Sequence, residues 1–398
     1  MDQWNAREVQ GAGLTTGTDR WGIQDSVIGT ESTAFGTQFL GVPEQEGPYR
    51  SGPLTQGTDG EDMDLYFQSV SEKKPGDKWQ TLFERYWPAY RAWYLSDGLE
   101  QRATWLTCKE ALEAHMPRLL PTYDRLCDLA GGGDLAARFL SLWRPPAYIS
   151  GCSQIVWLGD GPKLVRNYDY SPALIDGVIM ESAWNGTKVI AMTDCLWGVL
   201  DGVNEKGLAV SLTFGGRRAV GEGFGIPVIL RNILEFCATV EDAAKVLADV
   251  PTHMAYNVTV VDKKGRFTTA YLAPGSRPVI KSVAYATNHQ GRIEWHDHAR
   301  ATATLEREQF LRFRLEDDKV TFPKLVDAFR KPPLYTNAYH NGFGTIYTAI
   351  YDPIDGSATY LFPDGSSKRF SFGDFKEEAW AMPIDGNGAP KTRGMDLI

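Results

Sequence analysis

Two hydrophobic patterns divide most of the chain. From about Asp77 to Trp143, apolar residues recur at helical spacing. The stretch DKWQTLFERYWPAYRAWYL forms a broad aromatic face, which indicates a helix buried on one side. The stretches ALEAHMPRLLPTYDRLCDLA and GDLAARFLSLW predict two more helices, and Pro145 with Pro146 follows the last of them. This part of the sequence therefore predicts a helical region.

After Tyr148 the pattern changes to short apolar runs of the kind typical of strands. The turns between them read GDG, NEKG, DKKG and DPIDG, which supply the Gly and Asp that hairpins need. Three helical stretches interrupt the strands: IPVILRNILEFC, TVEDAAKVLADV and ATATLEREQFLRFRLED. Helices between sets of hairpins predict an α+β fold with sheet packed on sheet and helices outside.

Residues 1–62 show neither pattern and are rich in Gly, Thr, Ser and Gln, which predicts a disordered tail. Within this tail LTTGTD recurs as LTQGTD. The repeat is either drift in a low-complexity sequence or a docking motif for a protein or shell partner. A third interpretation is that translation begins at Met63. The expected organisation is a tail (1–62), a helical segment (63–151) and a strand-rich segment (152–398).

Composition narrows the class of protein. With 43% hydrophobic residues among 398, the chain can build a large core. A net charge of -9 without a long basic run argues against nucleic acid as a partner. No apolar run is long enough for a membrane span and the N-terminus lacks a secretory signal, so we expect a soluble, cytoplasmic protein. The five cysteines have no CxxC spacing, which predicts reduced thiols.

The segment YISGCSQIVWLGDGPKLVRNYDY carries candidate chemistry. Cys152 begins a strand after the small pair Ser150 and Gly151, and Arg166 and Asp169 follow on the next strand. If the two strands form a hairpin, both charged side chains return close to Cys152, and a guanidinium favours a reactive thiolate. The alternative is a buried structural cysteine with an exposed ion pair.

Further candidates lie in turns and on a helix. Asn204 stands in DGVNEKG, and Asn288 with His289 ends the strand YATNH. Neutral asparagine amides are suitable donors to an oxyanion, although asparagine is also common in turns. Arg307 follows on a predicted helix. The order Cys, Arg, Asp, Asn, Asn, Arg is therefore a composite pattern.

The run GCSQIVW, LVRNYDY, DGVNEKGLAVSLTFGG, YNVTVVDKKG, ATNHQ, TATLEREQFL and TIYTAIYDP resembles the autoproteolytic N-terminal-nucleophile hydrolases related to acyl-coenzyme A:isopenicillin N acyltransferase. More distantly it is similar to choloylglycine hydrolase, penicillin V acylase and acid ceramidase. The resemblance extends from about Met63 to the C-terminus. It implies an αββα sandwich and a precursor that cleaves itself between Gly151 and Cys152.

The resemblance also implies a mechanism. The Cys152 thiol attacks the carbonyl of Gly151, and water completes the cut; glycine permits the strained backbone that this step needs. The freed α-amine of Cys152, with an ordinary pKa near 8, then serves as the base for its own thiol. Asp169 would orient this amine, and Arg166 would stabilise the thiolate.

The remaining roles follow from the same resemblance. Asn204 and Asn288 would hold the oxyanion. Arg307 matches the arginine that the family carries toward the C-terminal end of its sequence. Arg300 lies close by in the sequence and is the alternative. Tyr168 and His289 are candidate substrate contacts.

The expected function is an amidohydrolase or acyltransferase that acts on a linear amide through a Cys152 acyl-thioester. The substrate is a small N-acyl amide or acyl donor, and coenzyme A is a candidate co-substrate. Neither a metal nor a prosthetic group is needed. Two alternatives stay open: an unprocessed Cys-His thiol hydrolase using His289, His253 or His340, and a non-catalytic cargo or binding protein that uses its N-terminal tail. A metal site at His296 and His298 beside Asp297 lacks a third ligand.

Overall fold

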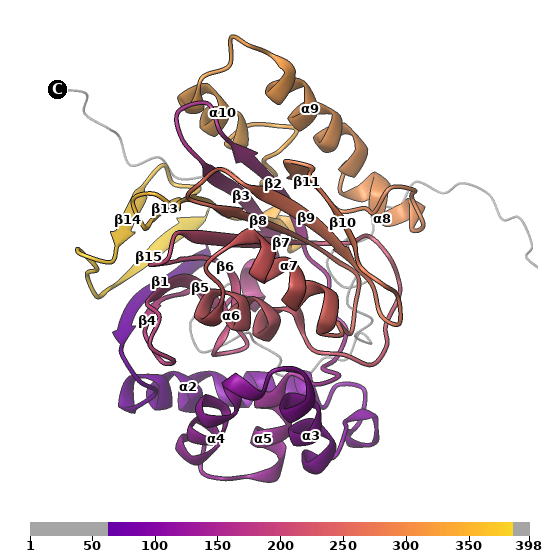
Figure 1. Ribbon diagram of the computed structural model, residues 1–398, viewed down its shortest axis with the longest axis vertical. Helices are drawn as coiled ribbons and strands as arrows, with labels where there is room; N and C mark the ends of the chain where they lie inside the picture. The colour runs from indigo at the N-terminus through magenta and orange to yellow at the C-terminus, as the bar shows by residue number, and fades with distance from the viewer. Residues whose placement is uncertain (1–62, 385–398) are drawn as a thin grey trace, which may run out of the picture. The chain divides into compact units, whose positions relative to one another are not determined.

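The structure of the protein is a computed structural model that describes residues 63–384. The predicted tail with its LTxGTD repeats lies outside the described residues, and so do residues 385–398. In the described part, two β-sheets pack face to face and helices cover their outer faces (Figure 1). This arrangement confirms the predicted α+β class and the αββα sandwich. No helix between residues 63 and 384 is long and apolar enough to cross a lipid bilayer.

The larger sheet has nine strands, which are β1 (Met63–Glu72), β4 (Val178–Ser182), β5 (Val189–Asp194), β6 (Gly198–Asn204), β7 (Leu208–Phe214), β8 (Tyr256–Asp262), β9 (Phe267–Leu272), β10 (Val279–Lys281) and β15 (Glu378–Ile384). Their order is β10-β9-β8-β7-β6-β5-β4-β1-β15. Neighbours are antiparallel except β1 and β4, which are parallel. The apolar runs that predict strands are SQIVWLG, KLVRNYDY, GVIMESAW, KVIAMTD, GLAVSLTF, NVTVVDKKGRFTTAYLA, VAYATNH, TIYTAIYDPIDGSATYLF and KRFSF. None of these runs covers β1, β6, β10 or β15, so these four strands were not predicted. The segment 63–151, expected to be helical, therefore begins with a strand of the larger sheet.

The smaller sheet has six antiparallel strands, which are β2 (Gly151–Trp157), β3 (Lys163–Tyr170), β11 (Tyr285–Ala286), β12 (Gly344–Asp352), β13 (Ser357–Leu361) and β14 (Ser367–Ser371), in the order β11-β2-β3-β12-β13-β14. Side chains alternate between the faces of a strand. Gln154 of β2 bonds to Ser211 and Thr259 of the larger sheet. Ile155 points the other way and packs in a cluster with Leu311 of an outer helix. Cys152, two residues before Gln154, therefore faces the larger sheet.

Two helices cover each outer face. On the larger sheet these are α6 (Ile226–Phe236) and α7 (Val240–Asp249); on the smaller sheet they are α9 (Thr304–Glu316) and α10 (Phe322–Phe329), with the short α8 (His296–Ala301) before them. Gly202 explains the close approach of α6, because a Cβ there would lie 2.8 Å from Leu234. Helix α10 was not predicted from the sequence.

The predicted helical region is present as α2 (Asp77–Tyr94), α3 (Trp105–His115), α4 (Leu120–Leu129) and α5 (Asp134–Ser141), and these helices gather on one side of the sandwich (Figure 1). Single helical turns occur at η1 (Leu99–Gln101), η2 (Pro117–Leu119), η3 (Pro172–Leu174) and η4 (Tyr339–Asn341). The stretch ALEAHMPRLLPTYDRLCDLA, which was predicted to be one helix, forms the end of α3 and the whole of α4, because Pro117 cannot continue α3. Trp79 and Phe83 of the aromatic face are buried, as expected.

Candidate active site

Cys152 lies on the central hairpin of the smaller sheet, formed by β2 and β3. In the pairing register Gly151 lies opposite Asp169, Cys152 opposite Tyr168 and Gln154 opposite Arg166. The turn between the strands contains the GDG sequence, which suits a tight reversal. The predicted hairpin is therefore confirmed, and it returns the Arg166-x-x-Asp169 sequence to the cysteine.

Arg166 contacts the sulfur of Cys152. Its Nη2 donates to Sγ at 3.1 Å, and the Ser150 hydroxyl lies 3.9 Å from the same sulfur. Cys152 is fully buried, and this burial raises the pKa of the thiol, while the charge of Arg166 acts in the opposite direction. The thiol is therefore protonated at neutral pH, with a cation in place for the thiolate.

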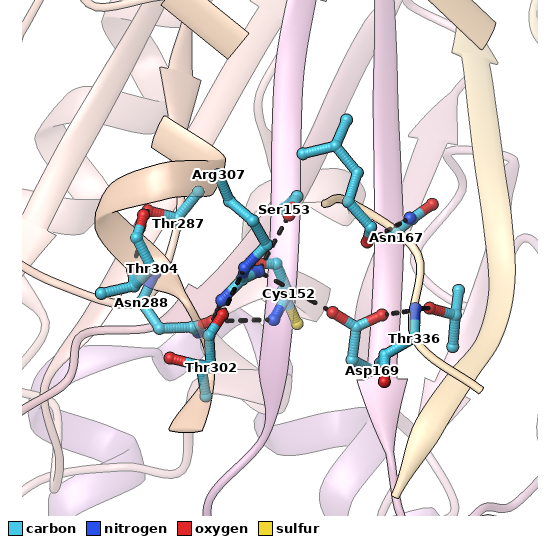
Figure 2. A network of polar contacts seen from close by, with 12 residues as sticks. Cys152, Ser153, Asn167, Asp169, Thr287, Asn288, Thr302, Thr304, Arg307 and Thr336 are labelled. Carbon is cyan, nitrogen blue, oxygen red and sulfur yellow. Dashed lines mark hydrogen bonds and ion pairs between the residues drawn. The ribbon is translucent and has the colours of Figure 1, made fainter. Parts of the chain in front are cut away.

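Asn288 and Arg307 hold the main chain of Cys152, as Figure 2 shows. The backbone N–H of Cys152 donates to Asn288 Oδ1 at 3.0 Å, and Arg307 Nη1 donates to the Cys152 carbonyl at 2.6 Å. Arg307 Nη2 also donates to Asn288 Oδ1 at 2.7 Å. One amide oxygen thus connects the arginine to the nitrogen that cleavage would turn into an α-amine.

Asp169 lies on the other side of this nitrogen in Figure 2. It accepts a hydrogen bond of 2.7 Å from Thr345 Oγ1, and its Oδ2 is 3.8 Å from Arg307 Nη1. Burial raises the pKa of Asp169, and the nearby Arg307 counteracts this rise. The structure brings Asp169 close to Cys152 as the sequence analysis expected, while its role toward an amine stays a prediction.

The amide nitrogen of Asn288 has two acceptors in the uncut chain. Nδ2 donates to the carbonyl of Phe214 at 3.1 Å and to that of Ser150 at 3.4 Å. Ser150 directly precedes the Gly151 carbonyl that the thiol would attack. The donor expected at the oxyanion therefore lies one peptide away from it.

The structure does not bring Asn204 to Cys152, which corrects the sequence-based expectation. Its Nδ2 donates to the carbonyls of Leu234 and Cys237 at 2.9 and 2.8 Å, at the C-terminal end of α6. Its Oδ1 accepts from the backbone N–H groups of Lys206 and Leu208. The side chain therefore closes a turn and caps a helix on the outer face of the larger sheet.

The two candidate arginines are clearly distinguished. Arg307 is buried and also donates to Ser153 Oγ at 2.9 Å. The side chain of Arg300 is 77% exposed and pairs with Asp297. Arg307 is therefore the arginine at Cys152.

Neither His253 nor His289 has a described hydrogen bond to Cys152. His289 is buried; its Nδ1 lies 3.0 Å from Thr304 Oγ1 and its Nε2 3.2 Å from Glu308 Oε2. His253 lies against Phe224, and burial lowers its pKa to about 4. His340 is exposed. The described contacts therefore offer nothing in favour of a Cys-His dyad.

Gly151 is needed for space. A Cβ at this position would lie 2.6 Å from the ring of Phe343 and 3.1 Å from the Cβ of Asp169. Gly151 is not among the glycines with positive φ and begins a regular strand. Gly151 therefore does not adopt a left-handed backbone, and glycine at this position permits the close packing of Phe343 and Asp169.

Tyr168 lies beside the thiol and lines a small pocket. Its ring lies 4.8 Å from the Arg166 guanidinium, and Phe67 and Tyr347 line the same pocket. Asp176 also lines it; burial and then repulsion from Asp194 raise the pKa of Asp176 to about 7. The candidate roles of Tyr168 and His289 in substrate binding stay predictions.

Sequence reasoning missed Asp201, which forms an ion pair with Arg166 between the sheets. The signal was a single carboxylate inside the otherwise apolar strand GVLDGVN, because a buried charge requires a partner. Among the described residues, no group of three or more His, Cys, Asp or Glu side chains is arranged to hold a metal ion.

The model of a family described as acyl-coenzyme A:6-aminopenicillanic acid acyl-transferase matches residues 157–367, more than half of the chain. Arg166, Asp169, Asn288 and Arg307 lie inside the match, and Cys152 lies just before it. A search of curated protein sequences found no match.

Several solved structures are similar to the chain, and three of them are a bile acid hydrolase, a penicillin V acylase and an acid amidase. A mutant of the conjugated bile acid hydrolase from Clostridium perfringens has 11% sequence identity and a TM-score of 0.45, covering 62% of this chain and 99% of that one. Penicillin V acylase from Agrobacterium tumefaciens has 14% identity and a TM-score of 0.38, covering 59% and 91%. An N-acylethanolamine-hydrolyzing acid amidase ortholog from Caenorhabditis elegans has 17% identity and a TM-score of 0.38, covering 58% and 100%.

Proposed function

The chain belongs to the acyl-coenzyme A:6-aminopenicillanic acid acyl-transferase family, and we propose that it cuts itself between Gly151 and Cys152 and then uses Cys152 as its N-terminal nucleophile. As a member of this family, it is an enzyme that hydrolyses amides or transfers acyl groups. The proposal adds the identity of the nucleophile and the activation step.

One observation carries the proposal: the sulfur, the backbone nitrogen and the carbonyl oxygen of Cys152 are each hydrogen-bonded to a polar or charged side chain. Arg166 contacts the sulfur, Asn288 the nitrogen and Arg307 the carbonyl oxygen. A structural cysteine needs no charged partner at its sulfur, because a buried thiol behaves as a small apolar group. Its backbone N–H and C=O need partners in any buried position, but these are commonly backbone groups of the sheet. Buried arginine and asparagine side chains that converge on one residue therefore support a reactive role.

The activation step would be an acyl transfer within the chain. Sγ of Cys152 attacks the Gly151 carbonyl carbon, the carbon–nitrogen bond breaks, and the thiol proton passes to the departing nitrogen. Water then hydrolyses the thioester, which leaves a carboxylate on Gly151 and a free thiol and amine on Cys152. Asn288 Nδ2, now on the Ser150 carbonyl, is the donor that would move to the oxyanion.

In the mature enzyme, the α-amine of Cys152 would accept the thiol proton as the sulfur attacks a linear amide. Asp169 would keep this amine oriented, since its buried carboxylate lies beside Cys152, on the side opposite Asn288. The substrate's amine leaves, and the acyl group remains on sulfur as a thioester. Water would then release an acid, whereas an amine or a thiol such as coenzyme A would accept the acyl group.

The test is the intact mass of the freshly purified chain under denaturing conditions. We expect two fragments in the wild type, one of which begins at Cys152, and a single uncut chain in Cys152→Ala. Cys237→Ala is the matched control, because Cys237 is also a buried thiol but lies at the end of α6; this variant should cut normally. A wild-type chain that stays whole on prolonged incubation would contradict the proposal.

A further inference from the structure

A buried ion pair joins the two sheets beside Cys152. Arg166 of β3 donates from Nη1 to Asp201 Oδ2 on β6, and neither side chain is exposed to solvent. Asp201 also accepts hydrogen bonds from the hydroxyls of Tyr347, at 2.8 Å, and Tyr351. Three donors from the smaller sheet therefore meet one carboxylate of the larger sheet.

This pair determines where the guanidinium points. A guanidinium is planar, so fixing one terminal nitrogen fixes the direction of the other. Nη1 of Arg166 is held by Asp201, and Nη2 lies 3.1 Å from the sulfur of Cys152. Nε of Arg166 has no hydrogen-bond partner within residues 63–384. All described hydrogen bonds of the guanidinium therefore come from Nη1 and Nη2.

The pair also determines the charge at the sulfur. The ionisable groups that face Cys152 are Arg166, Tyr168 and Asp169 from β3, Tyr347 from β12 and Arg307 from α9. Arg307 lies close to Asp169, which leaves Arg166 as the cation at the thiol. Arg166 is hydrogen-bonded to Tyr347 and Asp201, and its charge also acts on Asp194 of β5 and Tyr360 of β13. Tyr347 and Tyr351 are the other ionisable groups bonded to Asp201, which is the carboxylate paired directly with Arg166. Asp201 is thus the counter-ion of the cation that contacts Sγ.

We propose that Asp201 is a positioning residue of the active site, which holds Arg166 against the Cys152 sulfur and offsets the charge of its guanidinium. The assignment rests on the proposed function of Cys152. It goes beyond that function, because Asp201 touches neither the thiol nor the scissile peptide among its described contacts.

Such a counter-ion has a clear chemical consequence. An uncompensated guanidinium at 3.1 Å would favour the thiolate strongly, because little solvent screens the charge in a buried site. A neutral pair keeps the thiol protonated until a base removes the proton. The α-amine formed by cleavage would be that base, and Arg166 would already lie in place for the resulting thiolate.

A second buried pair provides a matched control. Arg231 and Glu235 of α6 are as deeply buried as Arg166 and Asp201, and they form an ion pair at 3.3 Å. Their described partners are Ser182, Trp184, Asn185 and Trp197, none of which has a described bond to Cys152. Glu235→Gln therefore removes a buried carboxylate of the same kind away from the thiol.

The experiment is the pH profile of Cys152 alkylation by iodoacetamide, read at the Cys152 peptide by mass spectrometry, for cut and uncut chains separately. In Asp201→Asn the profile should move to lower pH by about one unit, since an opposite charge left without its counter-ion favours the thiolate. Asp201→Glu, which keeps the negative charge, should stay close to the wild type. Glu235→Gln should not shift the profile.

An unchanged profile, or a shift to higher pH, in folded Asp201→Asn would overturn the proposal. If Asp201→Asn does not fold, Asp201→Ser replaces it, because the smaller side chain still accepts a hydrogen bond from Tyr347 and leaves room for a water molecule. Circular dichroism checks the fold of each variant. Alkylation requires neither self-cleavage nor turnover, so an uncut chain would count against the proposed function, while the pH profile alone decides the role of Asp201.

Discussion

Two regions of the molecule are built from the same parts and differ in what those parts hold. At Cys152 a buried asparagine, Asn288, lies near the buried pair of Arg166 and Asp201. On the outer face of the larger sheet, Asn204 lies near the pair of Arg231 and Glu235 at α6. The second set bonds only to backbone groups and to other structural side chains, whereas Asn288 and Arg166 of the first set both contact Cys152. Burial of polar groups therefore does not identify a site; the atoms that they contact do.

The largest expected difference between the regions concerns self-cleavage. Asn288→Ala removes the acceptor at the Cys152 nitrogen and the donor at Ser150, and should slow cutting about a hundredfold or more. Asn204→Ala should cut at the wild-type rate once folded. The measurement is the uncut fraction over time by intact mass. Equal rates of self-cleavage in Asn288→Ala and Asn204→Ala would show that the two regions do not differ in their role in cutting.

A smaller effect on cutting is expected from a change at Arg307. Arg307→Lys keeps the charge but cannot reproduce both bonds to Cys152 and Asn288, and should slow cutting about tenfold, as expected for the loss of hydrogen bonds to a charged group. Arg300→Lys is the control, because Arg300 is exposed. The same time course of intact mass decides; a normal rate in Arg307→Lys would show that charge alone suffices.

Stability should respond in the opposite order to cutting. Asn204→Ala leaves the buried carbonyls of Leu234 and Cys237 without their donor, and should lower the free energy of unfolding by about 2 kcal/mol. Thermal unfolding followed by circular dichroism measures this loss. Thr336→Ala is a mild control, because Thr336 is half-buried and its described hydrogen bonds use only its backbone N–H and C=O. An unchanged melting temperature for Asn204→Ala would refute its capping role.

The smallest expected effect separates Cys152 from Cys237, another buried thiol. Burial raises the pKa of Cys152, and it raises the pKa of Cys237 to about 12. A raised thiol pKa means that less thiolate exists at a given pH, so alkylation of both thiols in the uncut chain should be slow at pH 7 and increase as the pH rises. After the cut, Cys152 alone should label faster, because it gains an α-amine as base. Faster labelling of Cys237 as well would indicate a general loosening of the fold.

The pattern of apolar residues and turns predicted those parts of the fold that depend on residues close together in the sequence. The hairpin of β2 and β3 follows from alternating residues around the GDG turn, and it already brings Arg166 and Asp169 to Cys152. The helices between residues 77 and 141 follow from apolar spacing. Strands β1 and β15 were missed because they are recognisable chiefly by pairing with each other, across most of the chain.

The same distinction between local and long-range contacts applies to the residues of the active site. The sequence by itself determined the nucleophile candidate, the glycine before it and the charged residues of its own hairpin, since spacing within a hairpin determines which side chains meet. Only the tertiary structure showed that Asn288 lies at Cys152 while Asn204 does not, distinguished Arg307 from Arg300, and revealed Asp201. The physical reason is that each of these choices depends on contacts between elements far apart in sequence: α9 against β2, α6 against the outer face of the larger sheet, and β6 against β3. Residue type and turn chemistry are the same at the chosen and the rejected positions, and the partner across the packed interface makes the difference.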